Sequence, residues 1–207
     1  MAIATQNSMI NGLVPSTSVN PLVRDIFFVA VGVLLLAVSA RTQVPMWPVS
    51  ITLQDLVVML LGGLLGWRMG AISVLSYIAI GMAVSASVPW FAHPGYAMYP
   101  FVSATAGYLW GFVVAAAVIG LLLDNAGWRS NIALTFVAFM IGNVIIYAMG
   151  LAFAAAIYYP VIQGDAQSFQ NVWVWFAQKF IIGDVLKAVI ATGLIFAGAQ
   201  WLKGLRG

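Results

Sequence analysis

The sequence predicts an all-α integral membrane protein with six transmembrane helices in one domain. Of the 207 residues, 63% are hydrophobic and only 6% are charged, whereas about a quarter of the residues in a soluble domain carry a charge. The apolar stretches, such as residues 29–40 and 135–147, are continuous, while a transmembrane strand alternates apolar and polar residues. A membrane-spanning helix needs about 20 residues, so the chain has room for about six helices with their loops.

Several residue types and motifs are absent from the sequence, which argues against several classes of function. It has no cysteine and a single histidine, His93, which argues against disulfides, thiolate chemistry and a multi-histidine metal site. The net charge of +3 is too small for a nucleic-acid-binding protein. The sequence also contains no P-loop, no nucleophile-elbow serine motif and no zinc-protease motif. We therefore expect a protein that is not an enzyme, has no catalytic residues, metal or cofactor, and does not hydrolyse ATP itself.

Charged residues and helix breakers give the boundaries of the six helices. We expect residues 1–21, which are polar and contain two prolines, to form a loose N-terminal tail. The helices are then expected over residues 22–40, 52–66, 69–87, 104–123 and 131–158, with a last helix that begins between 172 and 184 and ends near Lys203.

The first three helices are separated by short loops. The first helix ends at Arg41, and Pro45 and Pro48 break the chain after it. The second helix is short, so we expect it to be tilted or to be completed by the preceding loop. Arg68 marks a tight turn into the third helix.

Breakers separate the later helices in a region with almost no charge. No formally charged residue occurs between Met69 and Leu123, and the stretch is divided by Pro89, Pro94, Gly95 and Pro100. The next two loops contain Asp124, Asn125, Gly127 and Arg129, and then Pro160, Gly164 and Asp165. Clusters of proline, glycine and short polar residues of this kind mark loops.

Basic residues fall unequally on the two sides of the predicted bundle. With the N-terminus inside, the inner side carries Arg24, Arg68, Arg129, Lys203 and Arg206. The outer side carries Arg41 and Lys179. Because cytoplasmic loops are enriched in Lys and Arg, we expect both termini in the cytoplasm and the chain in a bacterial-type inner membrane.

An outer loop over residues 87–103 is rich in aromatic side chains. It contains Trp90, Phe91, His93, Tyr96, Tyr99 and Phe101. One interpretation is an interfacial belt, in which aromatic rings lie at the level of the lipid headgroups. The other is a lid over an outward-facing pocket, which is favoured by the concentration of rings and prolines in one loop beside two helices without charge.

Asp184 and Lys187 are the most informative charged residues. Counting back about 20 residues from Lys203, at about 1.5 Å each, reaches Asp184 near the outer boundary of the membrane. The i, i+3 spacing puts both side chains on one helix face. A charge at the centre of a membrane helix costs roughly 2.5–3.5 kcal/mol. We therefore expect the two residues to pair, to line a wet cavity or to hold a polar ligand.

Other polar residues are expected at a similar depth. Asn143 and Tyr147 are one turn apart in the outer half of the fifth helix, and Gln54 and Asp55 open the second helix. Each of them alone is more often an interhelical hydrogen bond than a ligand contact. Their convergence toward one end of the bundle is what favours a binding site.

Two glycines in the fourth helix are spaced for close packing. Gly107 and Gly111 form a G-x-x-x-G pattern, which allows two membrane helices to approach closely. The same pattern leaves room for a small ligand next to Tyr108. We consider close packing the better of these two interpretations.

Six segments resemble the signature blocks of the BioY family, the biotin-specific substrate-binding (S) components of energy-coupling-factor (ECF) transporters. They are residues 44–54, residues 66–70 followed by Ser73, Tyr77 and Gly81, and residues 88–92, 105–112, 147–150 and 182–187. The resemblance covers about residues 26–203. The combination of Pro-x-x-Ile-Thr-Leu-Gln with a later Gly-Asp-x-x-Lys is specific, whereas each motif alone is weak.

The resemblance implies a fold of six transmembrane helices, like that of other ECF S components, which captures biotin from the outside. The residues expected to bind the substrate are Asp184, Lys187, Tyr108, Tyr147, Asn143, Gln54 and Phe91. In this scheme Asp184 accepts hydrogen bonds from the ureido N–H groups. Lys187 meets either the ureido carbonyl or the carboxylate, and aromatic rings pack on the bicyclic ring system.

The resemblance also implies partners, namely a transmembrane coupling protein and a pair of ATPases. Ala30, Ala37 and Ala40 form a stripe of small residues on the first helix, which is either a docking face for the coupling protein or ordinary packing. Two other functions remain open. One is an S component for another small vitamin, and the other is a secondary transporter, channel or membrane enzyme that uses Asp184 and Lys187 as a proton relay.

Overall fold

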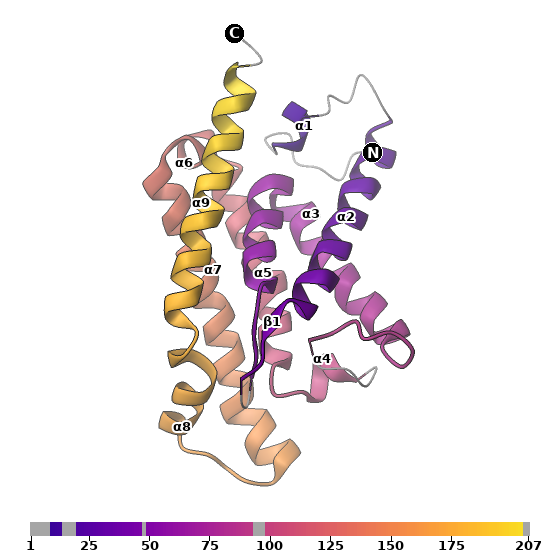
Figure 1. The fold of residues 1–207 in the computed structure, drawn as a ribbon, viewed down its shortest axis with the longest axis vertical. Helices are drawn as coiled ribbons and strands as arrows, with labels where there is room; N and C mark the ends of the chain where they lie inside the picture. The colour runs from indigo at the N-terminus through magenta and orange to yellow at the C-terminus, as the bar shows by residue number, and fades with distance from the viewer. Residues whose placement is uncertain (1–8, 14–19, 47–48, 93–97, 205–207) are drawn as a thin grey trace.

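The computed structural model describes residues 9–13, 20–46, 49–92 and 98–204, with the side chains of residues 202 and 203 left out. Within these residues the chain is a bundle of long helices (Figure 1). The α-helices are α1 Ile10–Leu13, α2 Pro21–Arg41, α3 Gln54–Val84, α4 Tyr99–Val102, α5 Ala106–Leu123, α6 Ala126–Ser130, α7 Ile132–Phe153, α8 Phe169–Trp173 and α9 Ile181–Gly204. Two π-helical segments, η1 Ala154–Gln163 and η2 Val174–Gln178, continue α7 and α8.

The predicted helical fold is confirmed, with one small addition. The strands β1 Gln43–Val44 and β2 Ile51–Thr52 pair antiparallel, with Gln43 opposite Thr52 and Val44 opposite Ile51. The ladder therefore closes the proline-containing loop between α2 and α3. It also places the backbone of Thr52 directly before the first turn of α3.

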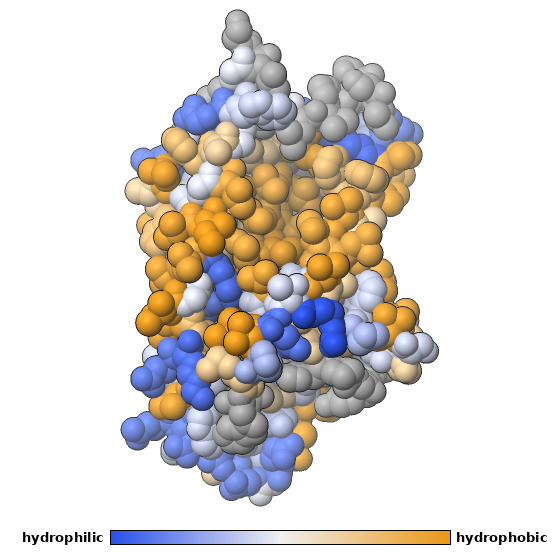
Figure 2. Space-filling view, in the orientation of Figure 1, coloured by the Kyte–Doolittle hydropathy of each residue, from blue (hydrophilic) through white to orange (hydrophobic). Residues whose placement is uncertain are grey.

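Several helical runs are long and apolar enough to cross a membrane. They are Pro21–Arg41, Gln54–Val84, Ala106–Leu123, Ile132–Gln163 and Phe169–Trp201. The face shown in Figure 2 agrees with this, because hydrophobic residues cover much of its upper and middle part, and hydrophilic residues gather toward its two ends and in one patch below the middle. Large apolar side chains on α2, such as Leu34 and Val38, are 60% and 65% exposed, which suits a surface in contact with lipid.

Helix α3 folds back on itself at Gly66. This residue has φ 79° and ψ 175°, a conformation that residues with a side chain rarely adopt. A Cβ placed on Gly70 would lie 3.2 Å from Gly62 Cα, and the Gln54 amide donates to the Tyr77 hydroxyl at 3.1 Å. Residues at equal or nearly equal distances along the chain on either side of Gly66 thus meet, so α3 consists of two antiparallel halves. We predicted two helices here, with the turn at Arg68 rather than at Gly66.

Glycines let α5 pack closely against its neighbours. A Cβ on Gly107 would lie 3.0 Å from Gly150 Cα, and one on Gly111 would lie 3.1 Å from Ile146 Cα, both on α7. The predicted role of the G-x-x-x-G pattern in close helix packing is therefore confirmed. Because Gly107 directly precedes Tyr108, this contact also fixes the position of the Tyr108 backbone, from which its side chain extends.

The last two long helices compare differently with the prediction. The fifth predicted helix was expected to stop before Pro160, but π-helical turns carry it through Pro160 to Gln163. It ends at Gly164, whose φ is 71°. The last helix was expected to begin between 172 and 184 and to end near Lys203, and α9 begins at Ile181 and ends at Gly204, as predicted.

Two further expectations need correction. Residues 1–21 were expected to be a loose tail, yet Met9 and Ile10 are only 4% and 1% exposed and belong to the main core. Residues 1–8 and 14–19 lie outside the described residues. The proposed docking stripe is also interrupted, because Ala40 is fully buried and Ala37 packs partly against the core. Of the three alanines, only Ala30 is exposed.

The molecule has two ends with different contents. The β-ladder end contains the ladder, α4, α8 and the first turn of α9, and the α6 end contains α6, the start of α2 and the last turns of α9 (Figure 1). The Gly66 turn belongs to the α6 end, because a Cβ on Gly120, near the end of α5, would touch the backbone of Trp67. Arg68 and Arg129 lie at the α6 end. Arg206 lies outside the described residues.

Candidate functional site

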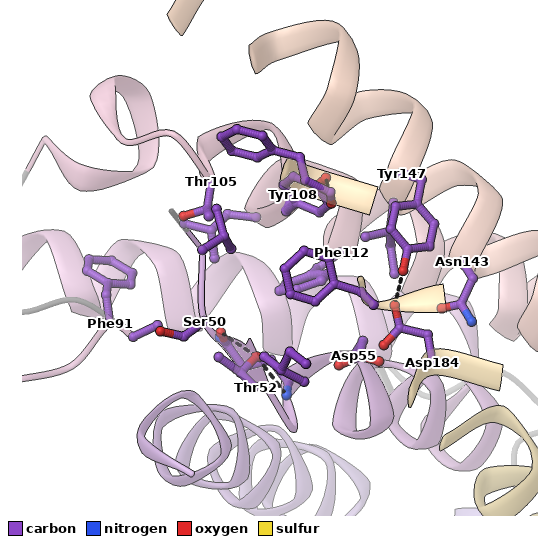
Figure 3. A pocket seen from close by; sticks show the side chains of 18 of the residues that line it. Ser50, Thr52, Asp55, Phe91, Thr105, Tyr108, Phe112, Asn143, Tyr147 and Asp184 are labelled. Carbon is purple, nitrogen blue, oxygen red and sulfur yellow. Dashed lines mark hydrogen bonds between the residues drawn. The ribbon is translucent and has the colours of Figure 1, made fainter. Parts of the chain in front are cut away.

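All the residues predicted to bind the substrate line one cavity at the β-ladder end. The empty space, counted together with its open mouth, is about 750 Å³. Of its lining, the residues named from the sequence are Gln54, Phe91, Tyr108, Asn143, Tyr147, Asp184 and Lys187. Several of their side chains converge on the same space (Figure 3).

Lys187 is the centre of a buried polar cluster. Its ammonium group donates to the backbone carbonyl of Thr52 at 2.7 Å. It also donates to Asp55 Oδ1 at 2.8 Å and to Asp184 Oδ1 at 3.0 Å. An ammonium group has three protons, and these three acceptors engage all of them. Two carboxylates therefore surround one cation.

The cluster joins three helices. Asp184 and Lys187 lie on one face of α9, as their spacing predicted, and Asp55 comes from the second residue of α3. From α7, the Tyr147 hydroxyl donates to Asp184 Oδ2. The side chains of Lys187, Asp55 and Asp184 are only 9%, 12% and 13% exposed. Burial of charges at this level requires such pairing.

Aromatic side chains form a second part of the cavity lining, the aromatic wall, which reaches the cluster at Tyr147. Phe91 is 1% exposed and stacks on Tyr99 with ring centroids 4.9 Å apart. On α5, the Tyr108 hydroxyl donates to the Phe176 carbonyl at 2.6 Å. Tyr108 and Tyr147 meet edge to face at 6.3 Å. An apolar ring system would find flat partners on this wall.

The loop that carries Phe91 is fastened to the helices around it. Trp90 Nε1 donates to the Tyr77 carbonyl at 2.9 Å, and the Tyr77 hydroxyl donates to the Trp90 carbonyl at 3.3 Å. Arg41 donates to the carbonyls of Phe91 and Ala92 at 3.3 and 3.2 Å. This part of the expected aromatic lid is packed over the cavity. His93 and Tyr96 lie outside the described residues.

Two polar atoms of the cavity are buried without a hydrogen-bond partner among the described residues. They are Asp55 Oδ2, an acceptor, and Asn143 Nδ2, a donor. Buried polar atoms in proteins are nearly always hydrogen-bonded. An unpaired acceptor and an unpaired donor in the wall of one cavity are what a polar ligand with both kinds of group would satisfy.

The sequence analysis missed part of this site. It noted Asp55 but did not name it as a binding residue, although a carboxylate at the start of a long apolar segment was itself a signal. It had no means of finding the Thr52 carbonyl, because a backbone group leaves no mark in the sequence. Phe112 and Phe180, which also line the cavity, are indistinguishable in sequence from other apolar residues of membrane helices.

The chemistry of the cavity is that of binding. Donors and acceptors gather in the cluster, and aromatic rings line much of the rest of the cavity. Among the described residues, no group of three or more His, Cys, Asp or Glu side chains is placed to hold a metal ion. The arrangement therefore suits a small ligand with a polar head and an apolar body.

Comparison with known proteins gives the family of the chain. A sequence model of the BioY family matches residues 7–204. The probable biotin transporter BioY of Lysinibacillus sphaericus is 39% identical over 176 residues, which cover 84% of this chain and 83% of that protein. The biotin transporter BioY of Rhizobium etli is 38% identical over 154 residues, covering 70% and 74% of the two chains.

A solved structure has the same fold. It is the crystal structure of the S component for biotin from an ECF-type ABC transporter, with a TM-score of 0.71 and 20% sequence identity, covering 86% of this chain and 92% of that one. Together with the apolar helices, these relatives make the chain a multi-pass membrane protein. Because the family model matches nearly the whole chain, the chain belongs to the BioY family.

Proposed function

We propose that this protein is the biotin-binding membrane subunit of a vitamin uptake transporter and captures biotin from the outer side of the membrane. The observation that carries the proposal is a single cavity that combines a buried Asp–Lys–Asp cluster with an aromatic wall, in a chain of the BioY family. The protein is not an enzyme. Its relatives carry the name of biotin transporters.

The chemistry of biotin suits both parts of the cavity. The ureido group offers two N–H donors and one carbonyl acceptor, and the carboxylates of the cluster offer the matching acceptors. The thiophane ring and the methylene groups of the side chain are apolar and can lie against Phe91, Tyr108 and Tyr147. Asn143 Nδ2, which has no partner among the described residues, supplies a donor for an oxygen of the ligand. Gln54 holds Tyr77 and so supports the wall.

We further propose that the chain crosses a bacterial inner membrane six times, with both termini in the cytoplasm. The antiparallel halves of α3 count as two crossings, and α2, α5, α7 with η1, and α9 supply the others. Basic residues support the orientation, because Arg24, Arg68 and Arg129 belong to the α6 end, and cytoplasmic ends are rich in such residues. The cavity then opens to the outside.

Concentrative uptake requires partners under this proposal. A binding subunit alone equilibrates biotin across the membrane, because accumulation needs an energy source. We propose a transmembrane coupling protein and ATPase subunits as these partners. Vesicles that hold the complete transporter should accumulate biotin when ATP is supplied, whereas vesicles with this chain alone should not. Accumulation by the lone chain under a proton gradient would identify a secondary transporter instead.

Isothermal titration of biotin into the detergent-purified protein tests the binding function. We expect saturable binding of one biotin per chain, because the described cavity holds one cluster and one aromatic wall. A different vitamin retained through purification, with no displacement by biotin, would assign the cavity to another substrate. Absence of biotin binding by a folded protein would overturn the proposal.

A further inference from the structure

Asp55 has an unused hydrogen-bonding capacity in the wall of the cavity. The residue is 8% exposed, and its Oδ1 accepts a hydrogen bond from Lys187 at 2.8 Å. Its Oδ2 is buried and has no hydrogen-bond partner among the described residues. A buried carboxylate oxygen left in this state is costly unless a donor reaches it. Because Asp55 lines the cavity, a bound ligand is the natural source of that donor.

The order of the polar groups along the cavity wall indicates how donors and acceptors are arranged in this ligand. Lys187 donates to Asp55 and to Asp184, and the protons of an ammonium group point apart at tetrahedral angles. The wall therefore presents an acceptor, a donor and a second acceptor, in that order. Asp55 and Asp184 come from α3 and α9, so the row exists only in the folded bundle.

A cyclic ureido group has the complementary row. Its carbonyl oxygen lies between two N–H groups, and the ring holds the two N–H bonds so that they diverge. One carboxylate cannot accept both diverging bonds with good geometry. Two separate acceptors that flank a donor can accept both, and Asp55, Lys187 and Asp184 form such a set.

We propose that Asp55 is a further ligand contact that determines specificity for a cyclic ureido head, with its Oδ2 accepting one N–H while Asp184 accepts the other. Lys187 then donates to the ureido carbonyl the proton that the Thr52 carbonyl accepts in this structure. Asp184 already accepts from Lys187 and Tyr147, but a carboxylate has about four lone-pair sites. This inference rests on the proposed biotin-binding function and adds a residue to its site.

The charge of the cluster supports the same assignment. Two carboxylates surround one ammonium group in a site that is almost closed to water. N–H donors of the neutral ureido head lower the cost of burying the second carboxylate without placing a further charge beside it. The second carboxylate is thus most stable when a ligand head with two N–H donors is bound.

The test compares the affinity of each protein variant for each of several ligand derivatives. The affinities are measured by isothermal titration. The variants are Asp55→Leu, which has a similar shape and no acceptor, and Asp55→Asn. The ligands are biotin and its two derivatives methylated at one or the other ureido nitrogen. Asp165→Asn is the matched control, because Asp165 is exposed and does not line the cavity.

We expect Asp55→Leu to weaken biotin binding about tenfold to a hundredfold, as for loss of a hydrogen bond to a charged group. In the unchanged protein both methylated derivatives should bind more weakly than biotin. In Asp55→Leu one of them should lose that disadvantage, while the other keeps it because its methyl group faces Asp184. Asp165→Asn should bind all three ligands as the unchanged protein does.

Three results would overturn the assignment of Asp55 while leaving biotin binding intact. They are unchanged affinity in both Asp55 variants, an equal loss for all three ligands, and a methylated derivative that the unchanged protein binds as tightly as biotin. The last measurement needs no variant, so it decides the question if the variants do not fold. Absence of biotin binding by the unchanged protein would instead overturn the proposed function.

Discussion

The two ends of the molecule both bury ion pairs, but the pairs are built differently. At the α6 end, Arg24 and Asp25 are neighbours in the sequence and meet at 2.8 Å, with side chains 3% and 0% exposed. At the β-ladder end, Lys187 meets carboxylates from two helices, and these groups line a cavity. The first pair joins residues that are neighbours in the sequence, whereas the second cluster joins one cation to two anions from different helices.

This difference separates a structural buried charge from one that serves binding. Burial of charge is costly at either end and is tolerated because each charge is paired. At the α6 end the pairing is between neighbours in the sequence. At the β-ladder end, Asp55 has an oxygen without a hydrogen-bond partner among the described residues, in the wall of a cavity. Burial of a charge alone therefore does not identify a site, whereas an imbalance of charges beside a cavity does.

The largest effect expected from this comparison is on stability. Arg24→Met leaves the Asp25 carboxylate buried without its neighbouring cation, and breaking a buried pair in this way costs about 3–5 kcal/mol of folding free energy. We expect a clearly lower thermal unfolding midpoint in detergent. The dissociation constant for biotin of the folded fraction should not change, because the pair lies at the α6 end. A tenfold weaker affinity would show that the two ends are coupled.

The second-largest expected effect is on the affinity for biotin. Asp184→Asn and Lys187→Met each remove one partner of a desolvated polar contact, which typically costs about 2–5 kcal/mol of binding free energy. Both variants should still insert and elute as the unchanged protein does in size-exclusion chromatography. Titration of biotin measures the loss, with Asp165→Asn as the control. If both variants bind biotin normally, the cluster is structural and the site lies elsewhere.

Two glycine-to-alanine variants, one at each end of the molecule, show how much close helix packing contributes to stability there. A Cβ on Gly107 would lie 3.0 Å from Gly150 Cα, and one on Gly62 would lie 2.7 Å from the Ala116 carbonyl oxygen. Overpacking of this kind costs typically about 1–3 kcal/mol. We expect Gly107→Ala and Gly62→Ala to lower the unfolding midpoint similarly.

Only Gly107→Ala should also weaken biotin binding, because it displaces Tyr108 in the cavity wall. Gly193→Ala is the control for the substitution itself, since a Cβ at Gly193 meets no atom within 4 Å among the described residues. Equal losses of affinity in Gly107→Ala and Gly62→Ala would mean that packing, rather than the position of Tyr108, controls the cavity.

The sequence predicted the long helices well because their signal is strong and local. Continuous apolar runs and charged ends place α2 and α5 within about two residues of their bounds. The turn in α3 was placed at Arg68 rather than Gly66, because a charge is easier to recognise than a positive φ. The π-helical turns of η1 and η2 were not predicted, because a continuous apolar run does not distinguish them from α-helical turns.

The site was predictable to the extent that its residues are unusual for a membrane helix. Asp184, Lys187 and Asn143 stand out in an apolar sequence, and their convergence followed from depth counting. The hydrogen bond from Lys187 to the Thr52 carbonyl was not predictable, because it depends on how the β-ladder presents a backbone oxygen. The second carboxylate on Lys187 was missed for the same reason, since Asp55 and Lys187 are 132 residues apart in the chain.

The smallest expected effect concerns the loop over the cavity. Arg41 is exposed and donates to the carbonyls of Phe91 and Ala92 at 3.3 and 3.2 Å. Hydrogen bonds of this kind contribute roughly 0.5 kcal/mol when they are long and solvated. We therefore expect Arg41→Met to speed biotin dissociation about twofold and to raise amide hydrogen exchange in residues 88–92. Arg68→Met, an exposed arginine at the α6 end, should change neither.

Amide hydrogen exchange in the unchanged protein, measured with and without biotin, also compares the two ends. If the loop closes over the ligand, biotin should slow hydrogen exchange across residues 87–103 and leave the Gly66 turn as it was. Arg41→Met should reduce this protection, because the carbonyls that Arg41 holds belong to the closing segment. Protection of the Gly66 turn and of α6, with none in residues 87–103, would place ligand entry at the α6 end. That outcome would reverse the proposed orientation in the membrane, since the basic residues would then lie on the side from which biotin enters.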